Sequence, residues 1–233
     1  MKPYRTLSSS IVIAASLLIT ACDSDDNNDS RVVLGTGNEI FELGILQYQT
    51  PFVVQVTDAE SNPAPGATVT FTLKPLSYFK GNYIATDTDN DLLAEPDQWV
   101  PTATAPECFT EDTNSNGALD AGEDTDGDGI LDPSNSATIT AHPDRTPTIT
   151  PGTATLVTDE NGFGYLAVTY PKSEAAWVKM QMIAEVQDSL PGNTVTHTFT
   201  LQVLLADVQN LTVAPPGGQT SPYGSATVCS DPS

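Results

Sequence analysis

Hydrophobic and polar residues alternate along several short segments of the second half of the chain. In residues 194–203, valines, Phe199, Leu201 and His197 occupy one face, and threonines with Gln202 occupy the other. In residues 177–186, Val178 and the alternate positions after it are apolar, whereas the positions between them are mostly polar. This period of two is typical of half-buried β-strands.

Further short segments predict strands of the same kind, at residues 52–56, 69–73, 154–157 and 165–170. Turn residues separate them, at 58–66 and at 159–162. In the second turn, Asn161-Gly162 predicts a tight hairpin, because both residue types accept positive φ angles. The chain is also rich in Thr, Val, Pro and Gly and lacks a long helical apolar stripe after its N-terminus. These features predict an all-β sandwich.

Two groups of motifs point to a more specific fold. They are Val56-Thr57-Asp58 with Pro63 and the run 65–71, and Thr158-Asp159-Glu160-Asn161-Gly162 with the three residues after it. They resemble the bacterial immunoglobulin-like domain of the invasin and intimin type, over residues 45–75 and 150–205. The resemblance implies one immunoglobulin-like β-sandwich over residues 45–205. Because about 75 residues separate its halves, we expect a large, loop-rich insertion at 75–150 rather than two domains.

The insertion contains a run of Asp and Asn residues at the spacing of an EF-hand calcium loop. The loop pattern places side-chain oxygens at positions 1, 3, 5, 9 and 12, a glycine at position 6 and a backbone carbonyl ligand at position 7. The residues at these positions are Asp112, Asn114, Asn116, Asp120, Glu123, Gly117 and Ala118. Since Ca²⁺ takes six to eight oxygen ligands, the segment is predicted to be a complete calcium loop.

A second loop follows at once. Its expected ligands are Asp124, Asp126, Asp128, the carbonyl of Ile130, and Asp132. Position 12 is Asn135 instead of Glu, so this site is expected to be weaker or to be completed from elsewhere in the chain. The tandem at 112–135 lacks flanking helices and resembles the thrombospondin type 3 calcium repeats, which implies a structural calcium site rather than a sensor. The alternative is a metal-free acidic loop, but no basic residue between Glu111 and Asp132 would relieve the repulsion.

Other candidate sites have weaker patterns. Asp87, Asp89 and Asp91 form a partial third loop, but Leu92 stands at the glycine position, so a solvated loop is expected. His142 is expected to be exposed. His197 on its apolar strand face is expected to be a core residue rather than a metal ligand.

Four aromatic residues of the insertion, Tyr78, Phe79, Tyr83 and Trp99, allow two interpretations. They form either a small core or a platform on which sugar rings stack. No serine–histidine–acid spacing, zinc motif or phosphate loop is present in the sequence, so no enzymatic activity is predicted.

The N-terminus predicts export. Lys2 and Arg5 precede an apolar stretch at 11–20 that is too short to span a bilayer, and Ala21-Cys22 follows it. This arrangement resembles the bacterial lipobox, which implies a signal peptide at 1–21 and lipid attachment at Cys22. The polar residues after it predict a flexible tether at 22–44. Asp23 resembles an inner-membrane retention signal of enteric bacteria.

The two remaining cysteines, Cys108 and Cys229, would then lie in an oxidising compartment. We expect them to pair and to pin an irregular C-terminal tail at 206–233; two free buried thiols are the alternative. The chain of 233 residues has 30 acidic and 8 basic residues, and removal of Lys2 and Arg5 with the signal peptide changes the net charge from −22 to −24. Such charge excludes nucleic acid as a partner and disfavours electrostatic docking on anionic lipid.

The expected protein is therefore a calcium-binding, non-catalytic lipoprotein of the bacterial cell envelope with a structural or protein-interaction role. It would be anchored through its N-terminal lipid on the periplasmic face of the inner or outer membrane, or on the cell surface. Its partner would be an envelope protein or a glycan. The alternative function is an adhesive or glycan-binding module that uses the insertion as its recognition surface.

Overall fold

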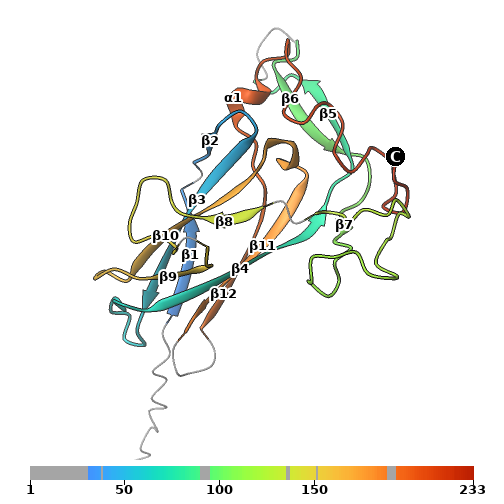
Figure 1. Cartoon of the computed structure of the whole chain (residues 1–233). Helices are drawn as coiled ribbons and strands as arrows, with labels where there is room; N and C mark the ends of the chain where they lie inside the picture. Colours follow the sequence, from blue (N-terminus) through green and yellow to red (C-terminus); the bar gives the residue numbers. More distant parts are fainter. Residues whose placement is uncertain (1–30, 38, 90–94, 135–136, 151, 188–192) are drawn as a thin grey trace, which may run out of the picture.

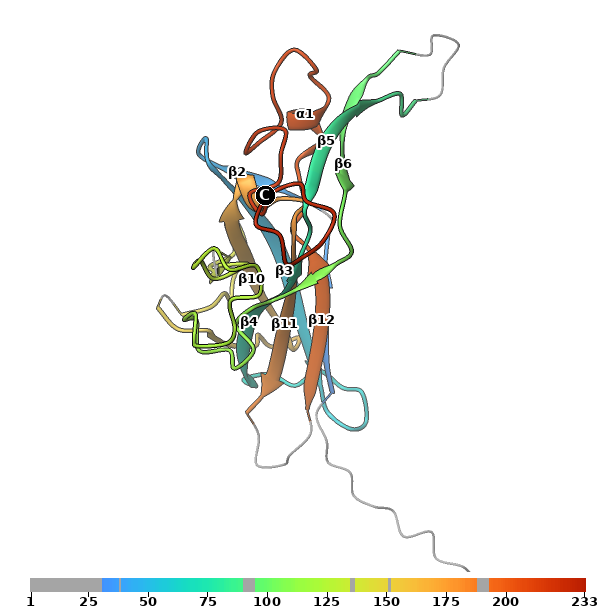
Figure 2. The same ribbon diagram turned by 90° about the vertical axis from the view of Figure 1, so that its right-hand side faces the viewer.

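The computed structural model describes residues 31–37, 39–89, 95–134, 137–150, 152–187 and 193–233. These residues form two antiparallel sheets that pack face to face, so the predicted all-β sandwich is confirmed (Figures 1 and 2). One sheet has the order β1-β3-β10-β8, with β2 also paired to β3. Its strands are β1 (Arg31–Thr36), β2 (Phe41–Leu43), β3 (Gln47–Thr57), β8 (Thr138–Thr140) and β10 (Phe163–Pro171).

The second sheet has the order β12-β11-β4-β7, with β9 also paired to β4. Its strands are β4 (Thr68–Tyr78), β7 (Cys108–Phe109), β9 (Thr155–Val157), β11 (Val178–Val186) and β12 (Thr194–Thr200). A separate hairpin of β5 (Gly81–Thr86) and β6 (Gln98–Ala103) extends beyond one end of the sandwich (Figure 2). The 3₁₀ turn η1 (Lys172–Glu174) and the short helix α1 (Leu205–Val208) complete the elements.

The alternating residues form the core between the sheets. In β11, Val178, Met180 and Met182 are buried and the residues between them are partly exposed, as the sequence pattern predicts. Phe52 of β3 contacts the rings of His197 and Phe199 of β12 across the sandwich. His197 is half-buried, and both of its ring neighbours are aromatic, so it packs at the edge of the core rather than within it.

The prediction of a hairpin at Asn161-Gly162 is wrong. β9 pairs with β4 in one sheet, whereas β10 pairs with β3 in the other, so the turn carries the chain between sheets. Gly162 has a φ of 74°, and Asn161 is not among the residues with positive φ, so the two-residue hairpin turn does not form. Leu156 of β9 is 1 % exposed and Leu166 of β10 is fully buried, so both strands contribute to the core from their separate sheets.

Substitution of Gly162 by Ala is expected to destabilise the protein by about 2 kcal/mol or more. The left-handed backbone is strained for alanine, and its Cβ would lie 2.3 Å from the Val56 carbonyl oxygen. Gly66→Ala is the matched control, because Gly66 has a φ of 75° and open space at its Cβ position. Urea unfolding of both variants measures the difference, and equal losses would show that the close approach to Val56 has no energetic weight.

The prediction of a flexible tether at 22–44 is wrong where the chain forms β1 and β2. Arg31–Thr36 forms β1 and pairs with β3 along its whole length, and Phe41–Leu43 forms β2. Val32 and Leu34 pack against the core, so the apolar residues of this segment have a burial surface that a tether would not offer. Residues 1–30, which include the predicted signal peptide and Cys22, lie outside the described residues.

The predicted insertion at 75–150 is more closely integrated than expected. β4 continues to Tyr78, β7 adds to the β4 edge of one sheet, and β8 adds to β10 in the other. The hairpin β5–β6 is regular structure rather than loop. The short edge strands β7 and β8 therefore fasten the insertion to both sheets, because unpaired sheet edges offer backbone groups that need hydrogen-bond partners.

The pairing of Cys108 with Cys229 is confirmed, with a Cα–Cα separation of 5.5 Å. The tail also binds the hairpin through backbone hydrogen bonds: Gly81 N–H donates to Gly224 O, and Tyr83 N–H donates to Gln219 O. Tyr223 of the tail is 7 % exposed and packs against Tyr78. The irregular tail is thus held by one covalent bond and by contacts along its length.

Candidate metal site

The Asp- and Asn-rich segment connects β7 to β8 and projects from one side of the sandwich, beside the C-terminal tail (Figure 1). Its first loop folds around the carboxylate of Asp112. Asp112 Oδ1 accepts a hydrogen bond of 2.9 Å from Asn116 N–H, and Oδ2 accepts one of 2.8 Å from Gly117 N–H. Gly117 has a φ of 77°, which lets the chain turn back over this carboxylate.

The other predicted ligands of the first loop converge on one another. Asp120 Oδ2 accepts hydrogen bonds of 2.8 Å from the side-chain amides of both Asn114 and Asn116. Ala118 donates its N–H to Asn116 Oδ1. The side chains at positions 3, 5 and 9 therefore face one small volume, as a calcium loop requires.

Glu123 closes the first loop. Its Oε1 accepts hydrogen bonds from the hydroxyl and the N–H of Thr113, and its Oε2 accepts one from Asp120 N–H. These donors, led by the Thr113 hydroxyl, hold the pKa of Glu123 below its ordinary value. The residue at position 12 is thus ionised at neutral pH and joins the two ends of the loop.

The second loop repeats this arrangement. Asp124 accepts the N–H groups of Gly127 and Gly129, and Asp128 Oδ1 accepts the N–H of Ile130 at 2.7 Å. Carboxylate oxygens of Asp126, Asp128 and Asp132 lie within 4.8 Å of one another. Burial, followed by the charges of Asp128 and Asp126, raises the pKa of Asp132 to about 7. These carboxylates repel one another strongly, and a cation between them would relieve the repulsion.

The structure also brings residues to the second loop that the sequence analysis did not assign. Lys80, at the start of the hairpin, is fully buried; its Nζ lies 3.2 Å from Asp126 Oδ2 and donates to Asp231 O of the tail. The expectation that no base relieves the repulsion therefore holds only within the segment. Lys80 is distant in sequence and stands among aromatic and polar residues, so no local pattern identifies it.

Glu111 is the second unassigned residue. It immediately precedes the first loop, is 1 % exposed, and has a carboxylate oxygen within 4.8 Å of those of Asp124 and Asp126. The calcium-loop pattern begins at position 1, Asp112, and Glu111 comes before it, so the pattern does not include this residue.

The donor set fits calcium. The groups at both loops are carboxylate and amide oxygens, and neither histidine nor cysteine joins the metal-ligating groups found among the described residues. Such all-oxygen sites suit hard cations such as Ca²⁺ and Mg²⁺, and a glutamate at position 12, as Glu123 is in the first loop, is the residue that binds Ca²⁺ through both oxygens in the EF-hand pattern. These acidic groups could thus hold a metal ion. Asn135, at position 12 of the second loop, lies outside the described residues.

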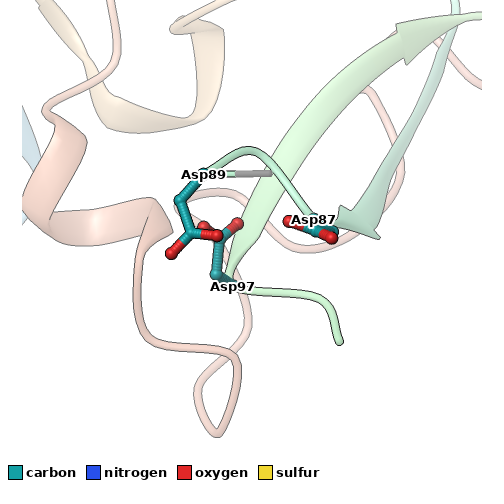
Figure 3. A group of neighbouring side chains, drawn as sticks. All are labelled: Asp87, Asp89 and Asp97. Carbon is teal, nitrogen blue, oxygen red and sulfur yellow. The ribbon is translucent and has the colours of Figure 1, made fainter. Parts of the chain in front are cut away.

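A third acidic group lies at the open end of the hairpin. Asp87, Asp89 and Asp97 approach one another there (Figure 3), and Asp97 accepts hydrogen bonds from the N–H and the hydroxyl of Thr88. Asp89 and Asp97 are exposed or half-buried. Asp91, which the sequence analysis included in this group, lies outside the described residues. The carboxylate oxygens of Asp87, Asp89 and Asp97 lie within 4.8 Å of one another, so this group too could hold a metal ion, and the solvated loop stays a prediction.

The four aromatic residues of the insertion pack inward. Tyr78 and Tyr83 are 1 % and 3 % exposed, and Phe79 and Trp99 are partly buried against the core. The ring of Tyr83 contacts Trp177 edge-on. These contacts support the interpretation as core rather than as a sugar-stacking platform. His142 is half-buried and meets the Tyr165 ring edge-on, so the expectation that it is exposed is wrong.

Comparisons with known proteins identify no relative. No protein-family model matches the chain, and no curated protein matches its sequence. Among solved structures, the fold is similar to the crystal structure of a DUF4466 family protein from Parabacteroides merdae ATCC 43184, with a TM-score of 0.23 and 8 % identity. The alignment covers 73 % of this chain and 44 % of that protein, so the chain spans less than half of its length. A likeness at this level carries no functional argument.

The described residues include no helix that is both long enough and apolar enough to cross a membrane.

Proposed function

We propose that this protein is a calcium-binding, non-catalytic lipoprotein of the bacterial cell envelope with a structural or protein-interaction role. One observation carries the calcium proposal: two consecutive loops of the calcium spacing fold in the same way around their position-1 aspartates, Asp112 and Asp124, and the second brings carboxylate oxygens within 4.8 Å of one another. In both loops this carboxylate accepts the N–H of the glycine at position 6, Gly117 or Gly129. The sequence pattern and the folded geometry thus support the same ligand positions.

A structural role for the ion follows from where the loops are attached. They connect β7 of one sheet to β8 of the other, so ions that order them would fix the path between the two sheets. Asp126 of the second loop also contacts Lys80, which binds the tail at Asp231 O. Calcium would therefore order the segment that joins the sheets, the hairpin and the tail.

The membrane attachment is proposed from the sequence, through lipid at Cys22. β1 begins at the end of the sandwich opposite the β5–β6 hairpin (Figure 1). A lipid anchor before β1 would leave the hairpin and the end around it facing away from the membrane, available to an envelope protein. The glycan-binding alternative is less supported, because Tyr78 and Tyr83 are buried and cannot stack on a sugar.

The proposal is tested by titrating metal-free protein with calcium chloride in a calorimeter. The unaltered protein is expected to bind calcium, and Glu123→Gln is expected to weaken one site by about a hundredfold or more, since position 12 is the bidentate ligand. Glu160→Gln is the matched control: it removes the same charge from an exposed turn far along the chain. The proposal would be refuted if calcium produced neither binding heat nor a change in the electrophoretic mobility of the unaltered protein.

A further inference from the structure

The two loops belong to an internal repeat that begins one residue earlier than the calcium pattern. Residues 111–122 and 123–134 share the same residue at six of their twelve positions. Each repeat opens with Glu-Asp-Thr, and each has Gly at its seventh position and Leu-Asp at its ninth and tenth. The first residue of the second repeat, Glu123, is the position-12 ligand of the first loop. Glu111 is the corresponding first residue of the first repeat, and the calcium pattern assigns it no ligand position.

The hydrogen bonds of the two glutamates are equivalent. Glu123 Oε1 accepts the N–H at position 2 of the first loop, Thr113, at 3.0 Å, and Oε2 accepts the N–H at position 9, Asp120, at 3.0 Å. Glu111 Oε1 accepts the N–H at position 2 of the second loop, Thr125, at 2.7 Å. Its Oε2 accepts the N–H at position 9, Asp132, at 3.0 Å. Glu111 thus occupies in the second loop the place that Glu123 occupies in the first.

The burial of Glu111 is a second observation. Glutamate is rarely buried without a charged partner. Glu111 is 1 % exposed, and no ion pair within the described ranges joins its carboxylate to a basic side chain. Lys80 is bonded instead to Asp126 and to a backbone carbonyl. Among the described residues, the charge of Glu111 is therefore held by backbone N–H donors alone, beside the carboxylates of Asp124 and Asp126, and a cation there would balance it.

We propose that Glu111 is the twelfth-position ligand of the second calcium loop, so that each repeat supplies the glutamate that completes the loop of the other. This inference rests on the proposed calcium binding. Its carboxylate lies within reach of an ion held by Asp124 and Asp126, since one oxygen of each of the three residues lies within 4.8 Å of the others. The second site is therefore complete, and the two sites share one closed segment of chain.

Calcium titration of metal-free protein separates this inference from the proposed function. The unaltered protein is expected to bind two calcium ions, Glu111→Gln one, Glu123→Gln one, and the double variant none. Glu111→Asp keeps the charge and both acceptor oxygens but withdraws the carboxylate by one methylene, so it is expected to weaken one site at least tenfold, within the roughly 10- to 100-fold range of perturbed metal sites. Circular dichroism in chelator shows whether each variant is folded.

Two ions bound to Glu111→Gln with unchanged affinities would overturn the inference and leave the proposed function intact. Should Glu111→Gln not fold, unchanged affinities of both sites in Glu111→Asp would overturn it in the same way. A single ion bound by the unaltered protein and retained by Glu111→Gln would also overturn it. Absence of calcium binding by the unaltered protein would instead refute the proposed function. Glu160→Gln, which changes an exposed residue, controls for the loss of one negative charge.

Discussion

Replacement of Cys108 by Ser is expected to lower the free energy of unfolding by about 4–5 kcal/mol. The disulfide joins residues separated by 121 positions, and a loop of that length restricts the unfolded chain strongly. The bond also fastens the tail to β7, beside the candidate calcium loops. Loss of the bond would therefore free the tail as well as enlarge the unfolded ensemble.

The measurement is denaturant unfolding under non-reducing conditions. Cys229→Ser and the double variant are expected to match Cys108→Ser, because each abolishes the same bond. Cys22→Ser is the matched control, since it removes a cysteine outside the pair and is expected to leave the midpoint unchanged. A midpoint for Cys108→Ser within error of the unaltered protein would show that the non-covalent contacts of the tail suffice.

Chelation of calcium is expected to lower the free energy of unfolding by a similar amount for each site that is emptied. At a free calcium concentration of about a thousand times the Kd, each site contributes roughly 4 kcal/mol. For a domain of this size the thermal midpoint would fall by roughly 10 °C for each site emptied. The physical cause is that the carboxylates of Asp126, Asp128 and Asp132, which lie within 4.8 Å of one another, repel once the cation is removed.

Differential scanning calorimetry with calcium and with a chelator measures this shift, and magnesium in place of calcium tests its selectivity. Hydrogen exchange is expected to rise in residues 112–134 and near Asp231, because Lys80 links the second loop to the tail. The double variant Glu111→Gln/Glu123→Gln is the control, in which the chelator should cause no shift. An unchanged midpoint of the unaltered protein would contradict the structural role of the ion.

Much of the sandwich is predictable from the sequence. The alternation in 177–186 and in 194–203 identifies β11 and β12, because one face of each strand is more buried than the other. The hairpin at Asn161-Gly162 is a wrong prediction, because a turn motif specifies a local bend but not the sheet in which the next strand pairs. β1 is missed because a six-residue edge strand with two exposed positions differs little from a polar linker.

Part of the candidate site, likewise, can be predicted from the sequence, and part cannot. The spacing of Asp112, Asn114 and Asn116 is visible in the sequence, since a calcium loop is a local structure whose ligands lie within twelve residues. The loop pattern does not include Lys80 or Glu111, because the fold brings the first from the connection between β4 and β5 and the second lies before the first loop, although it bonds to the backbone of the second.

The sequence by itself therefore determined the all-β class and the disulfide pair, and it predicts the oxygen ligands of each loop. The class and the loops depend on residue type and short-range spacing, whereas the pair follows from the two cysteines that remain besides Cys22. The tertiary structure decided which sheet each strand joins and which glutamate faces the second loop. These depend on contacts between residues far apart in the chain or across a turn, where burial of apolar faces and the pairing of backbone amides with carboxylates select one arrangement. In the fold, Glu111 bonds to the backbone of the loop that lacks a position-12 glutamate in the sequence, and this contact is the basis of the role proposed for it.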